Sequence, residues 1–145
     1  MEKRTKTLRT IRTQARYERH TAFTLPKHCY LCSAPPIRNY KHWKIIENQY
    51  PYDEIATMHH MVVSVYHARE AALHNEALEE YARVKNDLHQ EYDVILENTH
   101  KQKSIPEHHH LHLLRIKERV MTENEKRPRA VFLTPTNHTT NMSAP

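Results

Sequence analysis

The densest group of chemically reactive side chains is the segment SIPEHHHLHLL, residues 104–114, which places four histidines in five positions. If residues 108–116 form a strand, their side chains alternate between its two faces. Three histidines then share one face: His108, His110 and His112. They would be spaced about 6.5 to 7 Å apart at each step, which suits binding of a metal ion, a phosphate group or both. A strand with solvent-exposed histidines, or a loose metal-binding tract, is the alternative.

The two cysteines of the chain, Cys29 and Cys32, have the C-x-x-C spacing of half a metal site. Zinc prefers four tetrahedral nitrogen or sulfur ligands, and C-x-x-C commonly supplies two of them. A nucleic-acid-binding finger would need two histidines about 12 residues after Cys32. His42 lies near that position, without a properly spaced second histidine. The spacing is also compatible with a pair of reduced, unliganded cysteines or with a redox pair, although no thioredoxin-like βαβ pattern surrounds the motif.

Apolar patterning predicts the elements that must position these residues. Residues 42–48 (HWKIIEN) and 57–65 (TMHHMVVSV) have the composition of strands, as do residues 92–98 and 108–116. Between the second and third of these, apolar residues recur at helical spacing from about residue 68 to residue 92. Strands in adjacent pairs around one helix predict an α+β domain, in which an antiparallel sheet carries one main helix.

A length of 145 residues is that of a single domain with flanking segments. We expect a basic arm over residues 1–27, the α+β domain over residues 28–121, with a Pro-containing turn at SAPPIRNY, and a disordered polar tail over residues 122–145. The first twenty residues carry seven Lys or Arg against two Glu. This arm is interpreted as a solvated, weakly helical tail, as a binding segment for an acidic partner, or as an organelle transit peptide. No apolar run approaches the ~18 residues that a membrane span needs, and we expect a cytoplasmic protein.

The histidine segment HHHLHLL resembles the His-φ-His-φ-His-φ-φ signature, with φ an apolar residue, of the histidine triad (HIT) superfamily of nucleotide hydrolases and transferases. Upstream, HHMVVSVYH is similar to the family segment H-x-L-V-φ-P-K-x-H, and HWKIIENQYPYD is similar to the strand and turn that hold the ribose. The similarity covers roughly residues 29–116. It departs from the family pattern where His109 fills a φ position, where Ser64-Val65 replaces Pro-Lys, and where Ser104 lies four residues before the triad instead of three. The loop glycines of the family are absent as well.

The resemblance implies a nucleotide phosphohydrolase that acts at an α-phosphorus. His110, the middle histidine, would be the nucleophile and would form a covalent nucleotidyl-histidine, which water then cleaves. The implied substrate contacts are Asn48, His59, Asn98, Ser104 and His112. Related uridylyltransferases carry Gln in place of the third triad histidine, so His112 favours hydrolysis. A nucleotidyltransferase of the hexose-phosphate uridylyltransferase type and a non-catalytic nucleotide-binding module remain as alternatives.

The resemblance also implies a structural zinc ion. In zinc-bearing relatives the C-x-x-C pair is completed by the last histidine of the H-x-L-V segment and by the first histidine of the triad. The implied ligands are Cys29, Cys32, His67 and His108. Such a closed site leaves no coordination position for water, so its role would be structural. The expected partner is a nucleotide substrate, either a nucleoside phosphoramidate or a dinucleoside polyphosphate, and a homodimer and nucleic-acid binding through the basic arm are left open.

Overall fold

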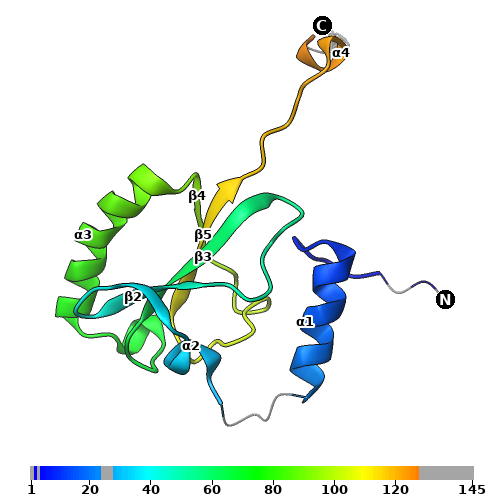
Figure 1. The fold of residues 1–145 in the computed structure, drawn as a ribbon. Helices are drawn as coiled ribbons and strands as arrows, with labels where there is room; N and C mark the ends of the chain where they lie inside the picture. The colour runs from blue at the N-terminus through cyan, green and yellow to red at the C-terminus, as the bar shows by residue number, and fades with distance from the viewer. Residues whose placement is uncertain (1, 3, 24–27, 128–145) are drawn as a thin grey trace, which may run out of the picture.

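The computed structural model describes residue 2, residues 4–23 and residues 28–127, and its centre is an antiparallel sheet (Figure 1). Within these residues the strands are β1 Pro36–Asn39, β2 Trp43–Glu47, β3 Ala56–Ser64, β4 Val94–Leu96 and β5 His110–Ile116. They lie in the order β1-β2-β3-β5-β4, and each neighbouring pair is antiparallel. The helices are α1 Ile11–Phe23, α2 Tyr30–Ser33, the 3-10 helix η1 Glu70–Ala72, α3 Asn75–Glu91 and α4 Glu123–Lys126. The prediction of an α+β fold with one longer helix is confirmed.

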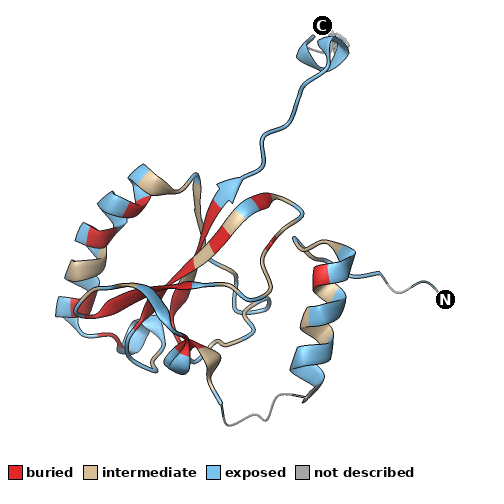
Figure 2. Cartoon of the chain, in the orientation of Figure 1, coloured by how far each residue is buried: buried red, intermediate tan, exposed pale blue. Residues whose placement is uncertain are grey.

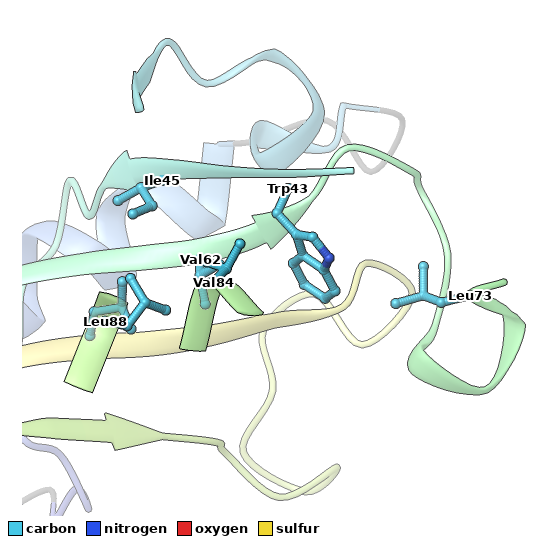
Figure 3. Packing of buried hydrophobic residues seen from close by; sticks show 7 residues of the cluster. Trp43, Ile45, Val62, Leu73, Val84 and Leu88 are labelled. Carbon is cyan, nitrogen blue, oxygen red and sulfur yellow. The ribbon is translucent and has the colours of Figure 1, made fainter. Parts of the chain in front are cut away.

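Helix α3 covers one face of the sheet, and the buried side chains between them form the main core (Figure 3). The buried residues of this cluster are Trp43, Ile45, Val62, Leu73, Val84, Leu88 and Leu113. Burial of one large apolar side chain contributes about 1.5 to 3 kcal/mol to stability. The buried indole of Trp43 also donates a 2.7 Å hydrogen bond from Nε1 to the carbonyl oxygen of Ala77. This contact ties the first turn of α3 to β2.

The opposite face of the sheet packs against the short helix α2. A second apolar cluster there joins Leu31 and Ala34 to residues of β2 and β3. Lys44 points to this face, and its Nζ donates hydrogen bonds of 3.2 Å to the carbonyl oxygens of Cys32 and Ala34. The C-x-x-C segment is therefore fixed to the sheet by both apolar packing and a buried ammonium group.

The register of the two central strands decides which side chains share this second face. Met61 of β3 pairs with His112 of β5, and Val63 pairs with His110. Because side chains alternate along a strand, His110 and His112 lie on the face opposite to α3. The period-2 pattern of the histidine segment thus predicts their common face correctly.

The N-terminal arm, one interpretation of which is a solvated, weakly helical tail, is helical over α1 and makes specific contacts with the domain. Asp53 accepts hydrogen bonds from the Thr10 main-chain N–H at 2.8 Å and from the Thr13 hydroxyl at 2.6 Å. Helix α1 is otherwise largely exposed (Figure 2), but Thr13 is buried. The arm is therefore docked on the loop between β2 and β3.

Two further segments differ from the sequence-based expectation. The segment SAPPIRNY, expected to be a turn, contains the edge strand β1, whose register with β2 shifts between Pro36 and Arg38. Of the expected disordered tail, Glu123–Lys126 form α4, which begins with a capping box between Thr122 and Glu125, whereas residues 128–145 lie outside the described residues. No helix in the described part of the chain is both long and apolar enough to cross a lipid bilayer.

Candidate active site and metal cluster

A pocket of about 500 Å³ opens on the sheet face that lies opposite to α3. Five of the predicted substrate-contacting or catalytic residues line it: Asn48, Asn98, Ser104, His110 and His112. The sixth, His59, does not line the pocket but is buried behind His112. The segments that meet here are helices α1 and α2, the loop between β2 and β3, strands β3 and β5, and the loop between β4 and β5, so residues far apart in sequence surround one volume.

The His110 ring is fixed by its own strand. Its Nδ1 donates a 2.8 Å hydrogen bond to the carbonyl oxygen of His108. A carbonyl oxygen only accepts, so the proton of the neutral ring lies on Nδ1 and the lone pair lies on Nε2. Burial lowers the pKa of His110, although the bond to His108 opposes part of this effect. The ring is therefore neutral near pH 7, with an unprotonated nitrogen in the pocket lining.

The protonation of His112 is set by a chain of two hydrogen bonds that begins at Tyr52. The main-chain N–H of Tyr52 donates to Nδ1 of His59 at 2.9 Å, so the neutral His59 ring carries its proton on Nε2. That Nε2 lies 2.8 Å from Nδ1 of His112 and donates to it. Nδ1 of His112 consequently accepts, and the proton of His112 lies on Nε2.

Both rings of this chain are held neutral. Burial lowers the pKa of His59 to about 3, and the positive charge of Arg9 adds to that shift. Burial, followed by the neighbouring His59 ring, lowers the pKa of His112 to about 2. His112 therefore offers a neutral N–H donor and not an imidazolium.

Amide and hydroxyl groups surround the Nε2–H of His112. Nδ2 of Asn98 lies 3.3 Å from it and donates to the Tyr52 hydroxyl at 2.8 Å. Since an amide nitrogen carries two hydrogens, Asn98 has a second N–H beside that of His112. Two neighbouring donors of this kind suit an anionic oxygen, such as that of a phosphate.

The remaining predicted contacts are held by tyrosines. The Tyr17 hydroxyl donates to Oγ of Ser104 at 2.7 Å, which leaves the Ser104 proton free to donate elsewhere. Oδ1 of Asn48 accepts from the Tyr50 main-chain N–H at 2.8 Å, which fixes the Asn48 amide. The shifted spacing of Ser104 therefore does not remove it from the pocket.

The four predicted metal ligands meet at one end of this pocket. Their candidate ligand atoms all lie within 4.8 Å of one another: Cys29, Cys32, His67 and His108. Nδ1 of His108 lies 3.4 Å from Sγ of Cys29 and 3.5 Å from Sγ of Cys32, and Nδ1 of His67 lies 3.3 Å from Sγ of Cys32. This group could hold a metal ion.

Hydrogen bonding orients the His108 ring toward the thiols, and burial shifts the pKa values of His108 and Cys32. Nε2 of His108 donates a 2.7 Å hydrogen bond to the carbonyl oxygen of Ser64, so its Nδ1 lone pair faces the thiols. Burial lowers the pKa of His108, which keeps the ring neutral. Burial, followed by the Cys29 thiol, raises the pKa of Cys32. A bound cation would offset this cost of ionising Cys32.

His109 lies on the other face of the sheet, as strand alternation predicts. It is buried, and its ring packs edge-on against Trp43 with centroids 5.8 Å apart. His109 also lies near two exposed carboxylates, Glu70 and Glu97, of which Glu97 pairs with Lys103 at 2.8 Å. His109 is thus a core residue that takes no part in the pocket.

Strand β5 begins at His110, two residues later than predicted. His108 therefore lies before the strand, and its side chain need not follow the strand's alternation. Its ring centroid lies 5.3 Å from that of His67. The first histidine of the segment therefore belongs to the metal cluster, while the other two on this face belong to the pocket.

Among the pocket residues that sequence reasoning misses are Arg9, Tyr17 and Tyr52. Tyr52 lies in an irregular loop, and Arg9 and Tyr17 lie in the arm for which the sequence predicts solvent exposure. The arm's local sequence shows only a basic composition, which does not distinguish a docked helix from a free one.

No protein-family model matches the chain, and neither does any curated protein. The resemblance to the HIT superfamily rests on the sequence segments described above, and the activity that it implies is a proposal.

Proposed function

We propose that this protein is a HIT-type nucleotide phosphohydrolase that forms a covalent nucleotidyl-histidine on His110. The observation that carries the proposal is the 2.8 Å hydrogen bond from Nδ1 of His110 to its own strand, which leaves Nε2 unprotonated in the lining of the pocket. A neutral imidazole of this tautomer is a competent nucleophile near pH 7. The lowered pKa of His110 supports this role because the ring then stays unprotonated near pH 7.

In the proposed reaction, the Nε2 lone pair of His110 attacks the α-phosphorus, a nitrogen–phosphorus bond forms, and the leaving group departs with the electron pair of its broken bond. Water then attacks the same phosphorus and loses a proton to the solvent, the nitrogen–phosphorus bond breaks, and the electron pair returns to Nε2. Negative charge develops on the phosphoryl oxygens in both steps. The N–H groups of His112 and Asn98 are arranged to stabilise that charge, and such a donor is worth about 2.7 to 4 kcal/mol in the transition state.

We further propose that the metal cluster holds a structural zinc ion. Zinc–sulfur bonds of about 2.3 Å and zinc–nitrogen bonds of about 2.0 to 2.1 Å in a tetrahedron place sulfur and nitrogen ligands roughly 3.5 Å apart. The three sulfur–nitrogen distances of 3.3, 3.4 and 3.5 Å agree with that spacing. Two thiols and two neutral imidazoles are also the donor set that zinc prefers. The ion would connect α2 to the start of β5 and so fix the carbonyl of His108 that orients His110.

The function is tested by adduct trapping with a labelled nucleoside phosphoramidate and a labelled dinucleoside polyphosphate. With at least one of these substrates, the parent protein should form an acid-labile phosphoramidate on His110 and release the nucleoside monophosphate. His110→Asn should form neither product while it still binds nucleotide. His109→Leu, which changes the adjacent histidine on the α3 face, should keep both.

Undiminished hydrolysis by His110→Asn would refute the proposed nucleophile. Nucleotide binding without turnover by the parent protein would instead support a binding module. Transfer of the nucleotide to a sugar phosphate in preference to water would support a nucleotidyltransferase.

A further inference from the structure

Arg9 precedes helix α1 and lines the same pocket as His110 and His112. Its Nε donates a 2.8 Å hydrogen bond to the carbonyl oxygen of Tyr50. The guanidinium carbon lies 4.1 Å from the ring centroid of Tyr17 and 5.1 Å from that of Tyr52. One hydrogen bond and two aromatic faces thus hold the Arg9 head group in place.

The charge of Arg9 is not neutralised by an ion pair within residue 2, residues 4–23 and residues 28–127. Asp53, the carboxylate on which the arm docks, is occupied by three donors from Thr10 and Thr13. Glu107, the acidic residue of the pocket lining, lies 3.5 Å from Arg69. Arg9 therefore presents its terminal N–H groups and a positive charge to the pocket.

Arg9 lies near the donors that are proposed to bind phosphate. Tyr52, which it covers, contacts both Asn98 and His112 through its hydroxyl group. The effect of Arg9 on its surroundings agrees with this position, because its charge lowers the pKa values of His59 and His112. A fixed guanidinium next to phosphate-binding donors suits a second phosphate, which it binds through paired N–H groups.

We propose that Arg9 binds the phosphates of the leaving group, so that the substrates are nucleotides with at least one phosphate beyond the α position. This inference rests on the proposed function, which places the α-phosphorus at His110. A dinucleoside polyphosphate or a nucleoside triphosphate offers an anionic leaving group to Arg9. A phosphoramidate offers an amine, which gains nothing from a nearby positive charge.

The experiment compares the affinities of a nucleoside monophosphate and the matching triphosphate for the His110→Asn protein, by calorimetry at fixed salt, for each of the four bases. Because a hydrogen bond to a charged group is involved, the triphosphate should bind about tenfold more tightly or better. Adding Arg9→Met should reduce that ratio to below about threefold. Arg12→Met, which removes the same charge from an exposed position of α1, should leave the ratio unchanged.

A second variant tests whether the preference for the triphosphate depends on the charge of Arg9 or on the contact between the arm and Ser104. Tyr17→Phe removes the hydrogen bond to Ser104 but keeps the ring beneath Arg9, so it should keep the preference for the triphosphate. The inference is wrong if the His110→Asn protein binds the triphosphate no more tightly than the monophosphate, or if the added Arg9→Met change leaves the preference for the triphosphate in place. Neither result would contradict the adduct on His110, which is tested separately. Failure of every nucleotide to bind would overturn both the inference and the proposed function.

Discussion

Nε2 of His59 lies 2.8 Å from Nδ1 of His112, and both rings are buried. The sequence predicts a substrate contact for His59, but this residue acts one layer behind the pocket. The main-chain N–H of Tyr52 fixes its tautomer, and that tautomer in turn fixes the proton of His112. In the proposed mechanism His59 is a positioning residue, and its removal should change the donor that faces the phosphate.

His59→Asn should slow turnover more than it weakens nucleotide binding, because His112 then loses the partner that keeps its proton on Nε2. The loss should stay below the roughly 100-fold to 1000-fold expected for removing a phosphate donor outright. Nitrogen chemical shifts of His112 should report mixed tautomers in the variant. His60→Asn is the matched control, since His60 points to the α3 face and bonds the Tyr92 hydroxyl at 2.7 Å; it should leave turnover intact. Equal losses from the two variants would contradict the positioning role.

Stability should fall as the pH drops from about 6.5 toward 3. The folded-state pKa of His59 is lowered to about 3, while the unfolded ring titrates near its ordinary value. Between these values the unfolded chain binds more protons, so the free energy of unfolding rises with pH. Each unit of pKa difference is worth about 1.4 kcal/mol. In urea unfolding from pH 4 to 7, His59→Asn should show a shallower pH dependence than the parent, and an unchanged slope would contradict the buried neutral ring.

The sequence predicts the histidine face and the metal ligands for different reasons. His110 and His112 alternate with apolar residues, and a period of two in a strand decides their common face without further information. His67 lies outside that pattern, and the pattern alone does not bring His108 to the cysteines, because the loop end and the strand start that do so are set by the whole fold. Their assignment depends on a motif resemblance.

Docking of the arm is not predictable from local pattern. It depends on Thr10 and Thr13, which bond a carboxylate about forty positions away in the chain. Polar contacts of this kind leave no apolar periodicity in the sequence. The same holds for Tyr52, whose loop position gives no sign that it contacts two buried histidines.

The purified protein should contain about one zinc ion per chain, with two sulfur and two nitrogen ligands. Cys29→Ser and Cys32→Ser should release the ion and lower the free energy of unfolding, because metal binding and folding of α2 are coupled. Ser33→Ala, next to the same motif, is the matched control and should keep the ion. Cobalt substitution should give the absorption of a tetrahedral site with thiolate ligands. A parent protein that melts at the same temperature with zinc and with a chelator would rule out a structural ion.

Asp53→Ala should detach helix α1 from the domain. Asp53 accepts three hydrogen bonds from Thr10 and Thr13, and although burial alone would raise its pKa, these bonds lower it. Loss of hydrogen bonds to a charged acceptor costs about 1.5 to 3 kcal/mol, which should appear as faster amide exchange across Ile11–Phe23 and not as global unfolding. Because the folded-state pKa of Asp53 is lowered, docking of α1 should be complete at neutral pH and weaken as the pH falls below about 4.

The matched control is Glu54→Ala, which removes the same charge from the adjacent exposed residue. In this variant the exchange rates of α1 should not change. If α1 exchanges equally fast in the parent and in Asp53→Ala, the arm is not held by this carboxylate, and the position of Arg9 in the pocket loses its structural basis.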